Sequence, residues 1–143
     1  MSTLERAIAI AASAHAGQLD KAGQPYILHP LRVMLRVQGE QERIAAVLHD
    51  VVEDTSVTME QLAAEGFSSE ALAAISALTK LPGETRIAAA QRAAANKIAR
   101  TVKLADNAEN MDLSRIASPS EKDYARLEEY KAVRELLLAS HAV

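Results

Sequence analysis

The chain has 143 residues, 49% of them hydrophobic and 24% charged, and a formal net charge of −3 at pH 7. This length suits a single domain, and the composition excludes a disordered or collagen-like chain. Cysteine is absent, which excludes disulfides, thiolate catalysis and cysteine zinc sites. The slight acidity argues against binding to nucleic acid, and no apolar run is long enough for a membrane helix. The N-terminal residues lack the pattern of a secretory signal, so we expect a cytoplasmic protein.

Composition and hydrophobic spacing predict an all-α fold. Alanine is abundant, aromatic residues make up only 3% of the chain, and only five Gly and four Pro interrupt it. These features favour closely packed helices over strands joined by tight turns. We expect a compact single-domain helical bundle of about seven or eight helices over residues 1–143. In chain order, the predicted segments are a helix starting at Ser2, then 31–37, 40–52, a short helix after Thr58, a helix from Ser68 or Ser69 to Leu78, 88–95, 97–110 and 119–139.

Local signals support several of these boundaries. Ser2 and Thr58 each precede a Glu or Gln by three residues, which is the spacing of a capping box. The segment 118–121 combines a capping Ser, a Pro at the first helical position and a Glu. Two Gly and a Pro within 17–25 predict a loop between the first two helices.

Polar residues crowd the end of the predicted 40–52 helix. His49 and Glu53 are four residues apart, as are Asp50 and Asp54, so each pair shares a helix face. Three carboxylates packed this closely would repel one another, or one of them would take up a proton. A bound metal ion would remove that conflict.

A further acidic residue lies inside the predicted 97–110 helix. Asp106 has apolar neighbours and needs a partner, and Asn110 shares its helix face. The economical arrangement brings two histidines and two carboxylates to one divalent ion: His29, His49, Asp50 and Asp106. This mixed nitrogen and oxygen set suits Mn, Fe or Zn, and it leaves positions for water and substrate.

Each of these residues also has a structural interpretation. His29 could pack or cap at a helix start, and Asp106 could be a surface carboxylate of an amphipathic helix. The acidic pair at 53–54 could form a solvated helix end, although carboxylates there oppose the helix dipole. We expect His15 to be structural and His141 to lie in a solvated tail.

Five segments in combination are highly specific for one family. They are residues 14–18, 21–30, 46–55, 77–81 and 102–106. Together they resemble the hydrolase domain of RelA/SpoT-type enzymes, which belongs to the HD superfamily of metal-dependent phosphohydrolases. The similarity extends from about Leu4 to Leu113, so the motifs fall within 4–113.

The resemblance implies hydrolysis of the alarmones ppGpp and pppGpp at the 3′-diphosphate, usually with Mn²⁺. Because the chain has no room for a synthetase or regulatory domain, it resembles a stand-alone small alarmone hydrolase. By position, the family's metal ligands correspond to His29, His49, Asp50 and Asp106. Its catalytic acidic pair corresponds to Glu53 and Asp54, and its substrate-contacting residues include Lys21 and Asn110.

Three positions depart from the family pattern. Asp20 stands where the family has an Arg that packs against the guanine base, Glu109 replaces a His, and Leu113 replaces a Thr. Asp20 cannot stack as a guanidinium does, and it would repel phosphates. Base specificity therefore stays open. Hydrolysis of guanosine alarmones is the main hypothesis, and hydrolysis of another nucleotide, such as (p)ppApp or a phosphorylated dinucleotide, is the alternative. A non-catalytic nucleotide-binding protein is a third.

The sequence leaves two further points open: which basic residue neutralises the phosphates, and what the last helix packs against. Lys21, Arg32 or Lys103 could neutralise developing phosphate charge. The last helix carries a series of apolar residues, namely Leu127, Tyr130, Val133, Leu136 and Leu137. We expect it to close the bundle, and packing against a second subunit of a homodimer is the alternative.

Overall fold

The computed structural model describes residues 2–114 and 116–141, with side chains up to Ala139 in the last helix, so the prediction for the His141 side chain lies outside the described residues. Apart from an isolated bridge between Leu19 and Pro25, the regular structure in these residues is helical, which confirms the all-α prediction. The helices are α1 Leu4–Ala14, α2 Leu28–Leu35, α3 Glu40–Leu48, α4 Val51–Asp54, α5 Met59–Ala64, α6 Ser69–Leu78, α7 Arg86–Ala94, α8 Lys97–Asn110 and α9 Glu121–His141. None of the described helices is both long and apolar enough to cross a membrane.

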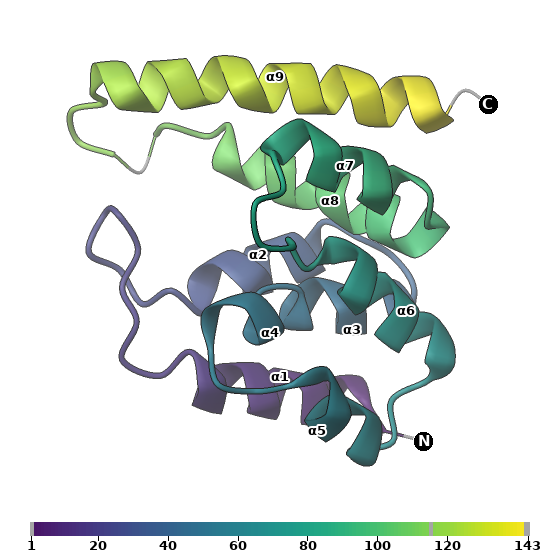
Figure 1. Ribbon diagram of the computed structural model, residues 1–143. Helices are drawn as coiled ribbons and strands as arrows, with labels where there is room; N and C mark the ends of the chain where they lie inside the picture. Colours follow the sequence, from purple (N-terminus) through teal and green to yellow (C-terminus); the bar gives the residue numbers. More distant parts are fainter. Residues whose placement is uncertain (1, 115, 142–143) are drawn as a thin grey trace.

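The helices are stacked in layers around α3. Figure 1 shows α1 and α5 at one end of the molecule and α9 at the other. Residues 44–48 of α3 are all buried, and α3 packs against α1, α2, α6 and α8. Several facing positions are alanines, such as Ala7, Ala11 and Ala74, which have no exposed surface. Small side chains at these positions allow the close approach of helices that the composition predicts.

α9 covers α7 and α8 as the outer layer (Figure 1). Val133 and Leu137 are buried in a small apolar cluster with Ala90 and Ala94 of α7. This packing agrees with the expectation that the apolar side of the last helix closes the bundle.

Most predicted helix starts are observed within a few residues. The capping box at Thr58 is present as predicted. The first helix is capped by Thr3, one residue beyond the predicted position, and the last begins after Ser120. There, Oγ of Ser120 accepts the N–H of Asp123, and the carboxylate of Asp123 accepts the N–H of Ser120. These reciprocal bonds satisfy two N–H groups that a helix start leaves free, which explains why the helix starts here rather than after Ser118.

The predicted 40–52 helix is interrupted. α3 ends at Leu48, and a single separate turn, α4, follows at Val51, so His49 and Asp50 lie at the joint between the two helices. The backbone of Asp50, at φ −101° and ψ −4°, departs from helical values. This break raises the number of helices in the described residues to nine, from the seven or eight expected, and it allows His49 and Asp50 to face α2 and α8.

Candidate metal centre and nucleotide site

Three parts of the fold bring the predicted metal ligands to one place. His29 lies in the first turn of α2, where Pro30 is tolerated because the N–H groups of a first turn have no partner within the helix. His49 and Asp50 occupy the joint between α3 and α4, and Asp106 lies on α8. Because α8 packs against both α2 and α3, Asp106 meets the histidines.

The ligand atoms of His29, His49 and Asp106 all lie within 4.8 Å of one another, and the three side chains are buried. Oδ1 of Asp106 is 2.8 Å from Nε2 of His29 and 3.3 Å from Nε2 of His49. Asp50 lies beside this group, with its Oδ2 atom 3.1 Å from Nε2 of His49. The structure therefore brings together all four residues that the sequence predicts as ligands.

The orientation of His49 fits a metal ligand. Its Nδ1 atom lies 2.5 Å from the carbonyl oxygen of Ala46, and because a carbonyl only accepts, Nδ1 carries the proton. In the neutral ring, Nε2 then has the free lone pair. Nε2 is buried and has no hydrogen-bond partner among the described residues, although two carboxylates are close to it. A lone pair facing carboxylates is repulsive unless a cation or a proton lies between them, so the donor set fits a divalent cation.

The electrostatics of the centre favour positive charge. Burial alone would lower the pKa of His49, but the carboxylates of Asp50 and Asp106 outweigh it and raise that pKa well above its ordinary value. Burial alone would raise the pKa of Asp106, yet the charge of His49 and the hydrogen bond with His29 hold it well below its usual range. A proton on His49, or a cation in its place, supplies the charge that the ionised carboxylates attract.

Tyr26 holds one of the candidate ligands in place, a role that no motif or spacing in the sequence indicates. Its hydroxyl donates a hydrogen bond of 2.5 Å to Oδ2 of Asp50. Burial, followed by the charge of Asp50, raises the pKa of Tyr26, so the phenol stays protonated and remains a donor. The tyrosine ring lies 5.1 Å from the ring of His15, which is buried and paired through Nδ1 with Gln18. This contact agrees with the structural role expected for His15.

Glu53 and Asp54 reach the same region from α4. Both line a cavity of about 340 Å³ together with His29, His49, Asp50 and Asp106; we call it the inner cavity. One carboxylate oxygen of Glu53 accepts the backbone N–H of Lys80 at 2.7 Å, which fixes the direction of the side chain. Burial, and then the charges of Asp50 and Glu53, raise the pKa of Asp54. A carboxylate with a raised pKa is a better proton acceptor than an ordinary one.

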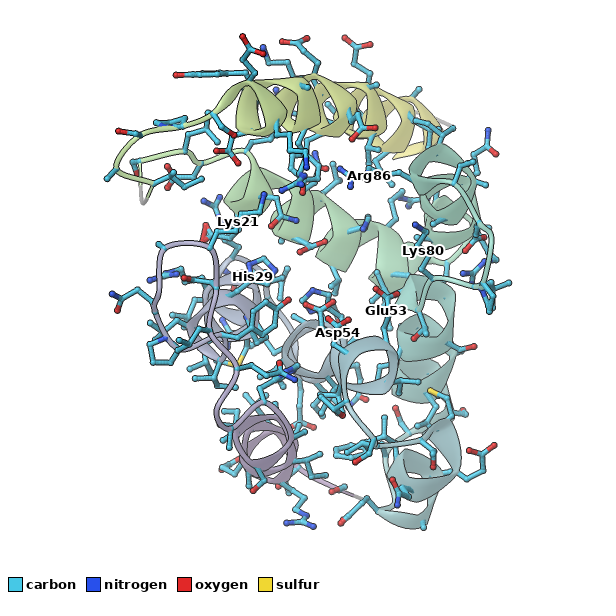
Figure 2. The ribbon with its side chains drawn as sticks, turned by 60° about the vertical axis from the view of Figure 1, so that its left-hand side comes forward. Lys21, His29, Glu53, Asp54, Lys80 and Arg86 are labelled. Atoms are coloured by element: carbon cyan, nitrogen blue, oxygen red, sulfur yellow. The ribbon has the colours of Figure 1, made fainter. Side chains whose placement is uncertain are left out.

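Basic side chains form part of the wall of the inner cavity. They are Lys80, Arg86 and Lys103, from the α6–α7 connection, the first turn of α7 and α8. Nζ of Lys103 is 3.4 Å from Oδ2 of Asp106, and the Arg86 guanidinium lies 4.7 Å from the centre of the Tyr130 ring. Figure 2 shows Lys21 and His29 to the left of this region, and Glu53, Lys80 and Arg86 to the right. The sequence suggests Lys21, Arg32 or Lys103 as the residue that neutralises phosphate charge, and of these only Lys103 lines this cavity.

A second, more apolar cavity of about 320 Å³ adjoins the first; we call it the outer cavity. Both cavities are lined by Tyr26, His29, Asn110 and Tyr130, so the two lie next to each other. The outer cavity is lined by Lys21 from the 17–25 loop, by apolar side chains such as Leu19, Leu113 and Ile116, and by Arg126 of α9. Its mixture of aliphatic, aromatic and charged groups suits a nucleoside. Arg126 and Tyr130 could not be predicted as residues of this site, because the apolar series of α9 indicates only a packing role.

Two of the three departures from the family pattern take part in local structure. Oδ1 of Asp20 accepts the N–H groups of Ala22 and Gln24, each at 2.9 Å, which closes the tip of the 17–25 loop. Glu109 is buried and pairs at 2.7 Å with Arg36, the residue that follows α2, and it lines neither of the two cavities. Asp20 and Leu113, by contrast, both line the outer cavity.

Known proteins resemble this chain in sequence. It is 35% identical over 135 residues to a probable GTP pyrophosphokinase of Mycobacterium leprae, an overlap of 85% of this chain and 17% of that protein. It is 44% identical over 80 residues to a probable guanosine-3′,5′-bis(diphosphate) 3′-pyrophosphohydrolase of Synechocystis sp., which covers 53% of this chain and 10% of the relative. The chain thus spans less than a fifth of the length of these curated relatives.

The fold also resembles a solved structure. A metazoan ortholog of SpoT, described as hydrolysing ppGpp, superposes with a TM-score of 0.75 over 98% of this chain and 85% of that one, at 22% identity. The model of the HD domain family matches residues 7–105, which include three of the four candidate ligands, and the fourth, Asp106, is the next residue along α8. With the histidines and carboxylates gathered at one buried centre in this fold, the match is decisive, and the chain belongs to the HD domain family.

Proposed function

We propose that this chain is a metal-dependent phosphohydrolase that removes the 3′-diphosphate of ppGpp and pppGpp as pyrophosphate. The observation that carries the proposal is the convergence of His29, His49 and Asp106 at one buried point, with Asp50 beside them. The acidic pair at 53–54 lines the same cavity. The relatives named as pyrophosphohydrolases support the choice of substrate, and a nucleotide substrate of this kind agrees with a cytoplasmic location.

We assign His29, His49, Asp50 and Asp106 to hold the divalent cation, with Mn²⁺ as the preferred ion. When bound, such a cation supplies Lewis-acid chemistry, because it withdraws charge from phosphate oxygens and lowers the pKa of a neighbouring water. Asp54, whose pKa burial and neighbouring charges raise, accepts the proton of the attacking water. Glu53, held by the Lys80 N–H, orients that water.

The remaining residues bind and neutralise the substrate. The water oxygen attacks the phosphorus on the ribose 3′-oxygen and the P–O3′ bond breaks. The released 3′-oxygen takes up a proton to become a hydroxyl, and pyrophosphate and the nucleoside 5′-diphosphate or 5′-triphosphate separate. Lys103, Lys80 and Arg86 face the charge that develops on the phosphate oxygens. The nucleoside occupies the outer cavity, where Lys21 and Asn110 contact it.

The test is turnover by metal-stripped protein supplied with single ions. With Mn²⁺ and ppGpp we expect GDP and pyrophosphate in equal amounts, and no product when a chelator is present. The absence of turnover with Mn²⁺, Fe²⁺, Zn²⁺ and Mg²⁺ would contradict the proposal. Tight alarmone binding without product would support the third hypothesis, a non-catalytic nucleotide-binding protein.

The position of Asp20 favours a second candidate, a phosphohydrolase of another nucleotide. Asp20 lines the outer cavity as a carboxylate, where a guanidinium would offer a flat stacking surface. A panel of ppGpp, ppApp and phosphorylated dinucleotides separates the two candidates by kcat/KM. A higher value for an adenine nucleotide than for ppGpp would favour the second.

A further inference from the structure

The connection between α6 and α7 is held in place by one ion pair. Glu84 binds Arg92 through both carboxylate oxygens, with Oε1 2.9 Å from Nη2 and Oε2 2.9 Å from Nε. Oε1 of Glu84 also accepts the backbone N–H of Leu81 at 2.9 Å, which closes the turn 81–84. We call this pair the Arg92–Glu84 clamp.

Arg92 also binds the end of α6 directly. Its Nη2 donates to the carbonyl oxygen of Thr79 at 2.6 Å, and its Nη1 donates to that of Ser76 at 3.2 Å. The last carbonyls of a helix lack partners within the helix and carry partial negative charge, so a guanidinium is a suitable cap for them. Because one planar group spans the carboxylate and the carbonyls, it fixes the start of the connection relative to α7.

The residue between these anchors touches the candidate site. The Lys80 N–H donates to Glu53 at 2.7 Å, and the side chains of Lys80 and Arg86 line the inner cavity. Arg92 and Glu84 themselves do not line it. Figure 2 shows Lys80 and Glu53 beside each other on the same side of the site. The direction of the Glu53 carboxylate therefore depends on where the clamp holds the backbone at Lys80.

We infer that Arg92 and Glu84 are positioning residues, which place the Lys80 N–H on Glu53 and thereby align the water-orienting carboxylate for phosphate hydrolysis. The expected effect on turnover rests on the proposed function. The expected effect on the backbone around Lys80 rests on the contacts alone. A shift of about 1 Å in a positioned group lowers turnover by as much as about 100-fold. The metal ligands do not contact the clamp, so metal binding does not depend on it.

The test compares Arg92→Gln, Glu84→Gln and the double variant with the wild type. Arg6→Gln is a matched control, because Arg6 forms an equally close two-pronged pair with Glu65, at 2.6–3.1 Å, between α1 and α5 and outside both cavities. Three quantities are measured for each protein: kcat and KM with ppGpp and Mn²⁺, the Mn²⁺ dissociation constant, and hydrogen–deuterium exchange over residues 79–84.

We expect Arg92→Gln to lower kcat by about 10- to 100-fold with an unchanged Mn²⁺ dissociation constant. Exchange over 79–84 rises by about tenfold, since the N–H groups of Lys80 and Leu81 lose their fixed acceptors. The double variant is no slower than Arg92→Gln, because both substitutions break the same contact. Arg6→Gln keeps the wild-type kcat and exchange at 79–84.

Unchanged exchange over 79–84 in Arg92→Gln would overturn the clamp. A loss of kcat matched by an equal loss of Mn²⁺ affinity would overturn it as well, because that pattern reports a general loss of structure. Absence of turnover in the wild type would overturn the proposed function instead, and the exchange measurement would still test the clamp.

Discussion

His49 directs Nε2 at Oδ1 of Asp106 across 3.3 Å, while its Nδ1 donates to the carbonyl oxygen of Ala46. The second contact determines which ring nitrogen has the lone pair, and the first shows that this lone pair faces a carboxylate. The two residues come from the α3–α4 joint and from α8, so their contact is made only in the folded chain. Because the pair needs a positive charge between its members, it links folding of the bundle to cation binding.

Replacement of Asp106 by Asn keeps the shape of the side chain and removes its charge. We expect Asp106→Asn to weaken Mn²⁺ binding by more than about 100-fold and to abolish hydrolysis, because the buried centre loses the carboxylate that both histidines approach. Titration calorimetry with Mn²⁺ measures this, with circular dichroism as a check on folding. Wild-type affinity in a folded variant would remove Asp106 from the ligand set.

Asp54→Asn separates the proton acceptor from the metal ligands. Asp54 lines the inner cavity but lies outside the group formed by His29, His49 and Asp106. We expect kcat to fall by about 100- to 10,000-fold while the Mn²⁺ dissociation constant stays the same. If the variant instead loses Mn²⁺, Asp54 belongs to the coordination shell.

Tyr26→Phe removes the hydroxyl that donates to Asp50 and leaves the ring in place. Residues that orient a metal ligand are worth about 10- to 100-fold in metal affinity, so we expect a decrease of that size in Mn²⁺ affinity. The melting temperature of the metal-free protein is the control for packing. An unchanged affinity would mean that Asp50 needs no orienting partner.

The Arg92–Glu84 clamp predicts a pH-dependent contribution to stability. The hydrogen bond from Arg92, and then that from the N–H of Leu81, lower the pKa of Glu84 to about 2 from its ordinary 4.5. A lowered carboxylate pKa stabilises the folded state fully above pH 4.5, and this stabilisation is lost as the pH falls towards 2. We therefore expect the difference in free energy of unfolding between the wild type and Glu84→Gln to shrink between pH 7 and pH 3 in metal-free protein. A difference that grows over this range would contradict the assignment.

Helices with strong local signals could be predicted from the sequence. The 97–110 helix is observed with the predicted bounds, and the capping box at Thr58 is present, because both depend on neighbours in the chain. The interruption at Asp50 could not be predicted, because the i, i+4 spacing of 49–54 is equally compatible with one continuous helix. The break serves contacts with α2 and α8, which lie far away in the sequence.

The candidate site could also be predicted only in part. Residue chemistry and a family resemblance together predict each of the four ligands and both residues of the acidic pair. The structure brings these residues together. The basic wall was predicted only through Lys103. Arg86 reaches the cavity because it stacks on Tyr130 of α9, a contact between distant segments that leaves no local pattern. Asp20, predicted to alter base recognition, also closes its own loop, and no spacing rule indicated that role.

The central claim is that one cation binds among His29, His49, Asp50 and Asp106. An anomalous difference map from a crystal of the protein grown or soaked with Mn²⁺ tests it most directly. The account predicts a single strong peak bonded to the Nε2 atoms of His29 and His49 and to the carboxylates of Asp50 and Asp106. A map with no peak at this point, or with ordered Mn²⁺ elsewhere on the protein only, would contradict it.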